Sequence, residues 1–181
     1  MIFRETAIRG VLEIELERRG DERGFFARLY CEKEFAEAGL KHPLVQINNS
    51  LSREAGTLRG MHYQLPPQAD ERLVRCVNGA VHDVVLDIRP DSPTYLKSVS
   101  AVLSAENRKM IFVPVGCAHG FLTLEPDTEI IYFVTDFYSP EHERGIRYND
   151  PALAIDWPMD PVVISEKDRN HPDFDPEVHL Q

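Results

Sequence analysis

Cysteine is scarce in this sequence, and no disulfide-type or metal-type spacing connects the three that occur. Cys31, Cys76 and Cys117 are an odd number spread over 181 residues, so we expect reduced thiols in a cytoplasmic protein. Long apolar runs are also absent: no stretch approaches the roughly 18 apolar residues of a membrane span. The opening MIFRETAIRG has no apolar signal-peptide core. We therefore expect a protein that is neither exported by a signal peptide nor membrane-spanning.

The sequence has fewer basic than acidic residues. Lysine and arginine number 20 against 30 aspartates and glutamates, for a formal net charge of −10. This balance argues against non-specific binding to nucleic acid or to an anionic membrane. An anionic ligand would have to meet a local cluster of arginines and lysines. The sequence also has no G-x-G-x-x-G dinucleotide motif, so we expect no redox cofactor.

What the sequence does contain is a series of short β-branched and aromatic segments. A chain of 181 residues suits one domain, and we see no repeat or linker that would divide residues 1–181. Turn signals separate the segments at fairly even spacing. In 81–88, Val81 and Asp83 face one way and His82 and Val84 the other. The expected strands are 11–16, 25–30, 44–51, 80–88, 110–115 and 129–137.

Helical signals are few. EKEFAEAGL (32–40) predicts a helix that ends near Gly39, and SEKDRN (165–170) allows a short one in the polar C-terminal tail. Many short strands at regular intervals are typical of a sandwich or barrel. Small barrels of this kind can hold one ligand in their mouth.

Two motifs each carry one histidine. Gly56–His62 has the form G-x5-H, and Pro114–His119 has the form P-x-G-x-x-H; together they resemble the two signature motifs of the cupin barrels. A metal-binding cupin continues to a second histidine, where this chain has Gln64, and to a glutamate, where it has proline and glutamine. Two histidines make a poor metal site, because a divalent ion normally takes three or four protein ligands. Hydrogen-bonded core histidines remain an alternative, but matched positions favour proton chemistry or anion binding.

The sequence is similar to the dTDP-4-dehydrorhamnose 3,5-epimerase family, a metal-independent branch of the cupins. The similarity covers nearly the whole chain, in order and at the family's spacing. It implies a cupin-type antiparallel β-barrel (jelly roll) with a few short helices, all-β in class. The stretches that carry it are DERGFFARLY (21–30), QINNS (46–50), GTLRGMHYQLPP (56–67), RLVRCVNGAVHDVVLDIRPDSPTY (72–95), LSAENRKMIFVPVGCAHGFLTL (103–124), YSPEHERGIRYNDP (138–151) and ISEKD (164–168).

The resemblance also implies a reaction and a substrate, a dTDP-linked 4-keto-6-deoxyhexose such as dTDP-4-dehydro-6-deoxyglucose. C3 and C5 flank the carbonyl, so each proton can leave to give an enolate, and inversion needs a base on one face and an acid on the other. By resemblance His62 is the base, Asp168 orients it, and Tyr132 is the proton donor. Without the resemblance, we would predict that Tyr132 is an aromatic side chain of the barrel core. No cofactor and no metal are implied.

Binding residues follow from the same resemblance. Arginines and lysines suit the diphosphate through their donors, and an aromatic face suits the thymine ring. Arg59 is expected to be buried towards the site, in a strand directly before a Gly60–His62 turn. Arg23, Glu143 and Lys167 have the alternative of being surface charges. The implied contacts are Arg23, Arg59, His119 and Lys167 for the diphosphate and nearby oxygens, Tyr138 for thymine, and Gln46, Asn48 and Glu143 for sugar and base.

The chain departs from the family pattern in four respects. Arg72 stands where a lysine is usual near the keto oxygen, and Arg28 stands where a glutamate is common. The loop before Gly56 is one residue longer, and Ile47 replaces a frequent aspartate. All of these changes concern substrate fit, so we also consider an enzyme that inverts C3 alone or acts on another nucleotide-linked ketosugar.

Two other classes remain open: a metal-dependent cupin enzyme using His62 and His119, and a non-catalytic sugar-nucleotide binder. The intact set of His62, Tyr132 and Asp168 argues against the binder. The resemblance further implies a homodimer formed partly by exchange of N-terminal strands.

Overall fold

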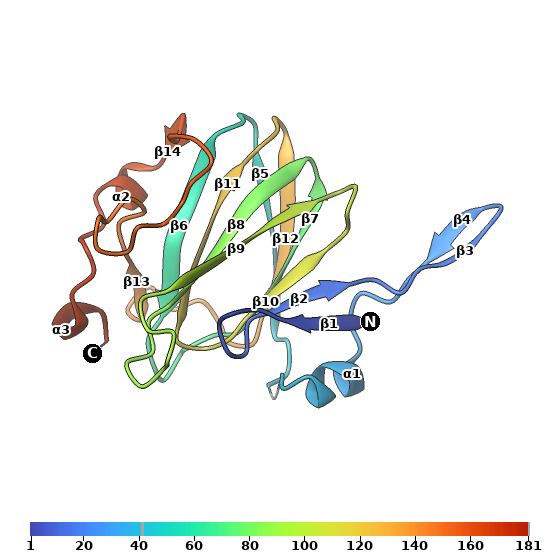
Figure 1. The fold of residues 1–181 in the computed structure, drawn as a ribbon, viewed down its shortest axis with the longest axis horizontal. Helices are drawn as coiled ribbons and strands as arrows, with labels where there is room; N and C mark the ends of the chain where they lie inside the picture. The colour runs from blue at the N-terminus through green and yellow to red at the C-terminus, as the bar shows by residue number, and fades with distance from the viewer. Residues whose placement is uncertain (41, 181) are drawn as a thin grey trace.

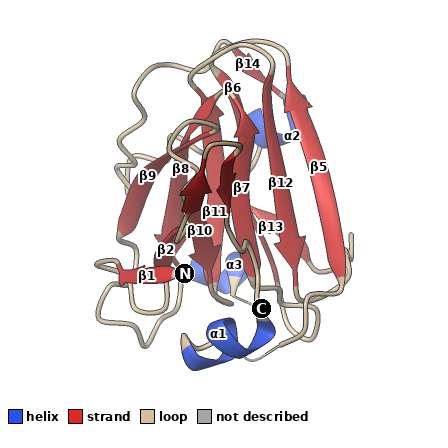
Figure 2. Cartoon of the chain, turned by 90° about the vertical axis from the view of Figure 1, so that its right-hand side faces the viewer, coloured by secondary structure: helices blue, strands red, loops and turns tan. Residues whose placement is uncertain are grey.

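Two β-sheets packed face to face form most of the protein (Figures 1 and 2). The structure is a computed structural model and describes residues 1–40 and 42–180. The first sheet runs in the order β1 (Ile2–Glu5), β2 (Leu12–Glu15), β10 (Met110–Val113), β7 (Arg72–Asn78), β12 (Thr128–Val134) and β5 (Gln46–Ser52). The second runs β13 (Glu143–Gly145), β6 (Thr57–Gln64), β11 (Cys117–Thr123), β8 (Ala80–Asp87) and β9 (Ser98–Ser104), with β14 (Val163–Ile164) added parallel to β6.

The predicted jelly-roll fold is confirmed, although hydrogen bonds among the described residues do not close the two sheets into one barrel. Five of the six expected strands are present with slightly shifted ends. The expectation of a strand over 25–30 was wrong beyond Phe26: that segment supplies only β4 (Gly24–Phe26), the partner of β3 (Arg19–Asp21). The chain then turns back, and the Tyr30 ring packs 5.1 Å from that of Phe35 in helix α1 (Glu32–Glu37).

Strand β8 separates the two main parts of the core, and its alternation is as predicted. Val81 and Val85 pack between the sheets, while Val84 and Leu86 pack on the other face beneath the C-terminal segment. Because both faces are covered, the strand is apolar on both sides, as buried strands usually are. Asp83 and Asp87 are nevertheless fully buried in it, and each must therefore have polar partners.

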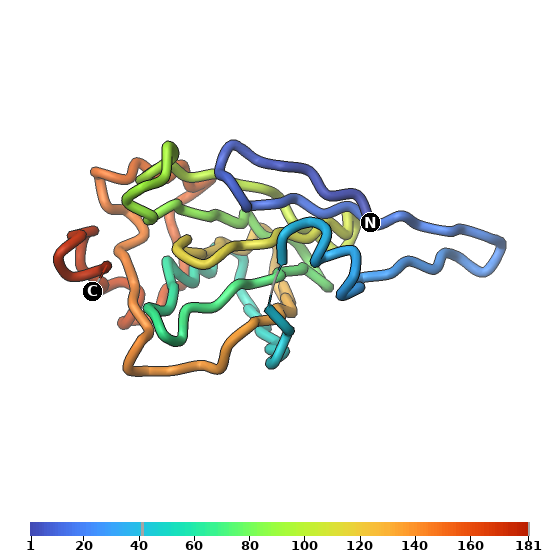
Figure 3. The backbone as a smooth tube through the Cα atoms, turned by 90° about the horizontal axis from the view of Figure 1, so that it is seen from below, coloured from blue at the N-terminus to red at the C-terminus, as the bar shows by residue number. Residues whose placement is uncertain are grey.

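Two segments outside the sheets lie on opposite sides of the protein (Figure 1). The β3–β4 hairpin, called the arm below, extends away from the sheets (Figures 1 and 3). The C-terminal segment covers the outer face of the second sheet and carries α2 (Glu166–Arg169) and α3 (Pro176–His179). The expected short helix in 165–170 is present as α2. Among the described residues, no helix is long and apolar enough to cross a membrane.

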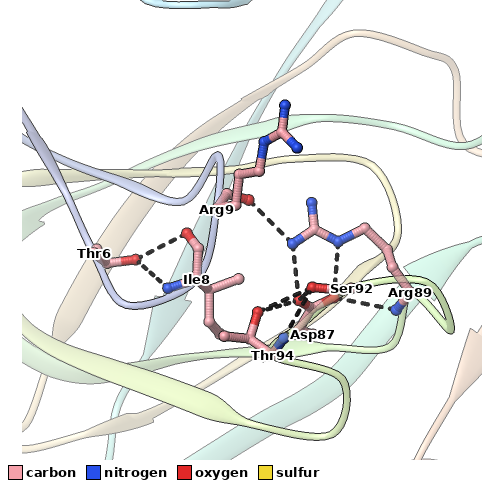
Figure 4. A network of polar contacts seen from close by, with 7 residues as sticks. All are labelled: Thr6, Ile8, Arg9, Asp87, Arg89, Ser92 and Thr94. Atoms are coloured by element: carbon pink, nitrogen blue, oxygen red, sulfur yellow. Dashed lines mark hydrogen bonds and ion pairs between the residues drawn. The ribbon is translucent and has the colours of Figure 1, made fainter.

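Asp87 ties the end of β8 to two loops (Figure 4). Its carboxylate accepts hydrogen bonds from Arg89 Nε at 2.8 Å, from Ser92 Oγ at 2.5 Å and from Thr94 Oγ1 at 2.7 Å. The Arg89 guanidinium also donates to the Arg9 carbonyl oxygen at 3.0 Å, in the turn between β1 and β2. Burial opposes the charge, but the hydrogen bonds from these partners lower the pKa of Asp87 to about 2.

Replacing Asp87 with asparagine is expected to lower the free energy of unfolding by about 2 kcal/mol at neutral pH, because hydrogen bonds to a buried charge are lost. A folded-state pKa below the ordinary value means that this stability is present above roughly pH 4 and is lost as pH falls towards 2. Urea unfolding across this range should show a flatter acid limb for Asp87→Asn. The exposed Asp91→Asn in the same loop is the control; an equal effect there would contradict the assignment.

Candidate active site

A cavity of about 460 Å³ lies between the two sheets. Each sheet supplies part of its wall. His62 and Arg59 come from β6 and His119 from β11, whereas Tyr132 comes from β12 and Arg72 from β7. Segments far apart in the sequence therefore meet here, which is the usual way a rigid sheet scaffold positions a site.

His62 is held by a buried carboxylate. Its Nε2 lies 2.7 Å from Asp168 Oδ1, and the backbone N–H of Gly60 donates to Asp168 Oδ2 at 3.3 Å. Ser165 caps α2 by accepting from the Asp168 N–H at 3.0 Å, which places this side chain over β6. Burial opposes the charge, but contacts from His171 and His62 and the Gly60 N–H lower the pKa of Asp168 well below its usual range. With Nε2 engaged, Nδ1 is the ring nitrogen left for chemistry in the cavity.

His119 has its own carboxylate. It pairs in register with His62 on the neighbouring strand, as the matched motifs predict, and its Nε2 lies 2.9 Å from Asp83 Oδ2. Both residues are buried. The two histidine motifs did not indicate Asp83. A charged residue that faces the core in an otherwise apolar strand could have indicated that it has a polar partner there. Because His119 points its Nε2 at Asp83, it does not share that nitrogen with His62 in a common metal site.

Tyr132 reaches the cavity from the opposite sheet. It lies in the middle of β12, paired in register with Asn48 of β5 and Val74 of β7. Its side chain is half-buried against the core between the sheets and lines the cavity wall. The tyrosine and His62 therefore face one space from two different sheets.

Arg72 lies beside this pair. Its guanidinium binds Asp70 at 2.8 Å and donates to the His62 carbonyl oxygen at 3.3 Å. The buried Asp70 carboxylate keeps the arginine folded against the wall, so Arg72 presents a fixed positive charge to the cavity. Asp70 is a second residue that the motifs did not indicate.

A second cavity of about 280 Å³ adjoins the first and shares His62, Arg72 and Tyr132 with it. Gln46 donates to Asn48 at 2.9 Å on its wall. The Tyr138 hydroxyl donates to Glu143 at 2.9 Å, and Lys167 forms an ion pair with the same carboxylate. Burial opposes this charge, but the hydrogen bonds from Lys167 and Tyr138 lower the pKa of Glu143.

Three expected site residues are placed differently. Arg59 lines the first cavity but is exposed, so its expected burial was wrong; residues 60–62 continue strand β6 rather than turn. Its guanidinium donates to Ser52 and to the Leu51 carbonyl oxygen at 3.4 Å, at the edge of the sheet. Arg23 and Arg28 lie in or beside the arm, paired with Asp21 and Glu34, and line neither cavity of their own chain.

Comparison with known proteins decides the family. A sequence profile described as dTDP-4-dehydrorhamnose 3,5-epimerase matches residues 5–176. The chain belongs to this family. A relative from Sinorhizobium fredii, named dTDP-4-dehydrorhamnose 3,5-epimerase, is 49% identical over 173 residues, which cover 95% of this chain and 89% of the relative. The predicted family and the epimerase class of enzyme are therefore confirmed.

Solved structures of sugar-nucleotide epimerases have the same fold as this chain. The 3,5-epimerase from Legionella pneumophila in complex with dTDP-4-keto-L-rhamnose superposes with a TM-score of 0.92 at 40% identity, covering 99% of this chain and 97% of that one. ChmJ, a 3′-monoepimerase from Streptomyces bikiniensis, superposes with a TM-score of 0.86 at 30% identity, covering 93% of this chain and 85% of that one. That ChmJ structure is a complex with dTDP and a double mutant, in which a histidine and a tyrosine 70 positions apart became asparagine and phenylalanine. The epimerase fold therefore covers nearly this whole chain.

Proposed function

We propose that the cavity between the sheets inverts C3 and C5 of a dTDP-linked 4-keto-6-deoxyhexose, with His62 as base and Tyr132 as acid. The observation that carries the proposal is that these two side chains line one cavity from opposite sheets. Inversion needs a proton removed from one face of a carbon and returned to the other. A tyrosine lies 70 positions after the histidine here, the same interval as between the two residues replaced in ChmJ.

The His62–Asp168 pair supplies the base. Asp168 accepts a hydrogen bond from the Nε2–H of His62, with 2.7 Å between Nε2 and Oδ1. The lone pair is then on Nδ1, which takes the proton from carbon. The carboxylate then stabilises the imidazolium that forms, as a buried carboxylate does beside a catalytic histidine. No redox step occurs, because the carbon loses and regains only a proton.

Positive charge and donors stabilise the enolate oxygen. Arg72 is fixed between Asp70 and the His62 carbonyl oxygen, and His119 is oriented by Asp83. Both line the first cavity. Donors that are already in place where charge develops lower the barrier without rearrangement. Tyr132 then gives its hydroxyl proton to the opposite face of the carbon.

The second cavity is the proposed place for the nucleotide. Tyr138 offers an aromatic face for thymine, and Gln46, Asn48 and Glu143 offer polar contacts. Arg59, which lines the first cavity, and Lys167, which forms an ion pair with Glu143 of the second, are the cations proposed for the diphosphate.

We also propose a homodimer in which the arm of one copy reaches the cavity of the other. The Arg23 side chain is 84% exposed and binds only the neighbouring Asp21 among the described residues. The adjacent Phe25 and Phe26 on the same arm are 44% and 70% exposed, and neighbouring exposed apolar side chains favour an interaction surface. Arg28, at the base of the arm, is assigned to the same surface.

The proposed location is the cytoplasm. Three free thiols support such a reducing compartment.

Incubation with dTDP-4-keto-6-deoxyglucose in D₂O tests the function, with deuterium at C3 and C5 followed by NMR. We expect enzyme-dependent deuterium at both carbons and a product inverted at both. Deuterium at C3 alone would make the protein a monoepimerase like ChmJ. No exchange above an enzyme-free sample, in protein shown to be folded, would overturn the proposal and direct attention to Arg28 and Arg72.

A further inference from the structure

The proposed mechanism leaves unused one mostly buried imidazole beside His62 and Asp168. His171 follows α2 and lies with its Nε2 3.5 Å from Asp168 Oδ1, too far for a good hydrogen bond. Among residues 1–40 and 42–180, this buried nitrogen has no hydrogen-bond partner. An unpartnered buried nitrogen costs free energy unless another group, such as a water or an ion, satisfies it.

The His171 ring is held in place by the backbone. It rests on Gly145 of β13, the register partner of His62, and a Cβ atom at position 145 would collide with the ring. The two imidazoles meet edge to face, with their centroids 5.6 Å apart and their planes at 80°. His62, Asp168 and His171 thus form a fixed cluster, and one ligand atom of each lies within 4.8 Å of the others.

These dimensions fit a tetrahedral ion. Zinc bonds of about 2.0–2.1 Å separate neighbouring ligand atoms by roughly 3.4 Å. The distance from Asp168 Oδ1 to His171 Nε2 is already 3.5 Å, whereas the one to His62 Nε2 is 2.7 Å, so His62 and Asp168 would have to move apart by roughly 0.7 Å for both to bind the ion. Two imidazoles and one carboxylate are ligands that zinc accepts, and in a tetrahedral site with three protein ligands a water takes the fourth position.

We propose that His62, Asp168 and His171 bind one zinc-type divalent ion, and that this ion inhibits the enzyme. Coordination through Nε2 of an uncharged His62 ring moves its remaining proton to Nδ1. The nitrogen that takes the carbon proton is then blocked, and Asp168 is withdrawn from the pair. Binding follows from the cluster alone, whereas inhibition rests on the proposed role of His62.

Direct binding is the first test. Chelator-treated protein is titrated with Zn²⁺ by calorimetry and with Co²⁺ by visible absorption, which reports four-coordinate geometry. We expect one ion per chain, and at least about tenfold weaker binding in His171→Ala and His171→Gln, since even changes outside a metal's ligands cost that much. His42→Ala, which removes an exposed histidine, should bind as the unaltered protein does. Absence of binding, or equal binding by folded His171 variants, would overturn the site.

Inhibition is measured separately by deuterium exchange, each variant being compared with its own metal-free rate. Saturating Zn²⁺ should reduce exchange at least about tenfold in the unaltered protein, and a chelator should restore it. In the His171 variants the same loss should need at least about tenfold more Zn²⁺. Binding without inhibition would overturn the inhibitory part. Absence of exchange in metal-free protein would count against the proposed function and leave the binding result intact.

Discussion

Replacing His62 with alanine is expected to reduce deuterium exchange at both C3 and C5 by about 10³-fold, within the range for loss of a general base. Both carbons should be affected, because the cavity offers one imidazole whose Nε2 is held by Asp168 and whose Nδ1 is left to act. His119 is held by Asp83 in a similar way but is almost fully buried, and it is assigned to the enolate oxygen, so we do not expect it to replace the base. NMR in D₂O, with equal amounts of folded protein, measures the loss.

Two controls separate a lost base from a damaged fold. Calorimetric binding of dTDP should stay within a few-fold of the unaltered protein, because Gln46, Asn48 and Tyr138, the proposed nucleotide contacts in the second cavity, are unchanged. His42→Ala, an exposed histidine outside both cavities, should exchange at the normal rate. Exchange surviving in His62→Ala at more than about a tenth of the normal rate would assign the base to another group.

The main elements of the fold followed from local patterns. Alternation in 80–88 placed Val81 and Val84 on opposite faces, and Gly39, with its φ of 109°, does lie just beyond the end of α1. The arm was harder, since GFF ends its strand at Phe26 while the residues to Tyr30 look equally suited to a strand. Their position depends on packing against α1, and such tertiary contacts override local propensity.

The site was predictable where a motif carried it. His62 and His119 were placed on paired strands, and the structure brings Asp168 to His62 from more than a hundred positions away. The sequence could not place Arg23, because the arm extends away from the sheets and no hydrophobic pattern shows where a charged side chain on it lies. His171 was missed for a related reason: only the packing of the C-terminal segment over Gly145 brings it beside Asp168.

The Tyr132→Phe substitution is expected to separate proton exchange from inversion. It removes a single hydroxyl from the sheet opposite His62. His62 can still take a proton from carbon and return a deuteron to the same face. We therefore expect deuterium exchange to persist at the carbon that reacts first. Net inversion should fall by about 10²–10³, as for loss of a general acid. Following deuterium and product configuration in the same NMR samples gives the ratio of the two rates.

Tyr148→Phe makes the same chemical change outside both cavities, and it should leave both rates unchanged. A matching fall of exchange and inversion in Tyr132→Phe would mean that the hydroxyl stabilises the enolate, as removal of an oxyanion donor slows every step that forms the charge. An undiminished inversion rate would remove Tyr132 from the mechanism. A rise in the ratio of exchange to inversion is the outcome that only a proton donor on the opposite face explains, because such a donor acts after the enolate has formed.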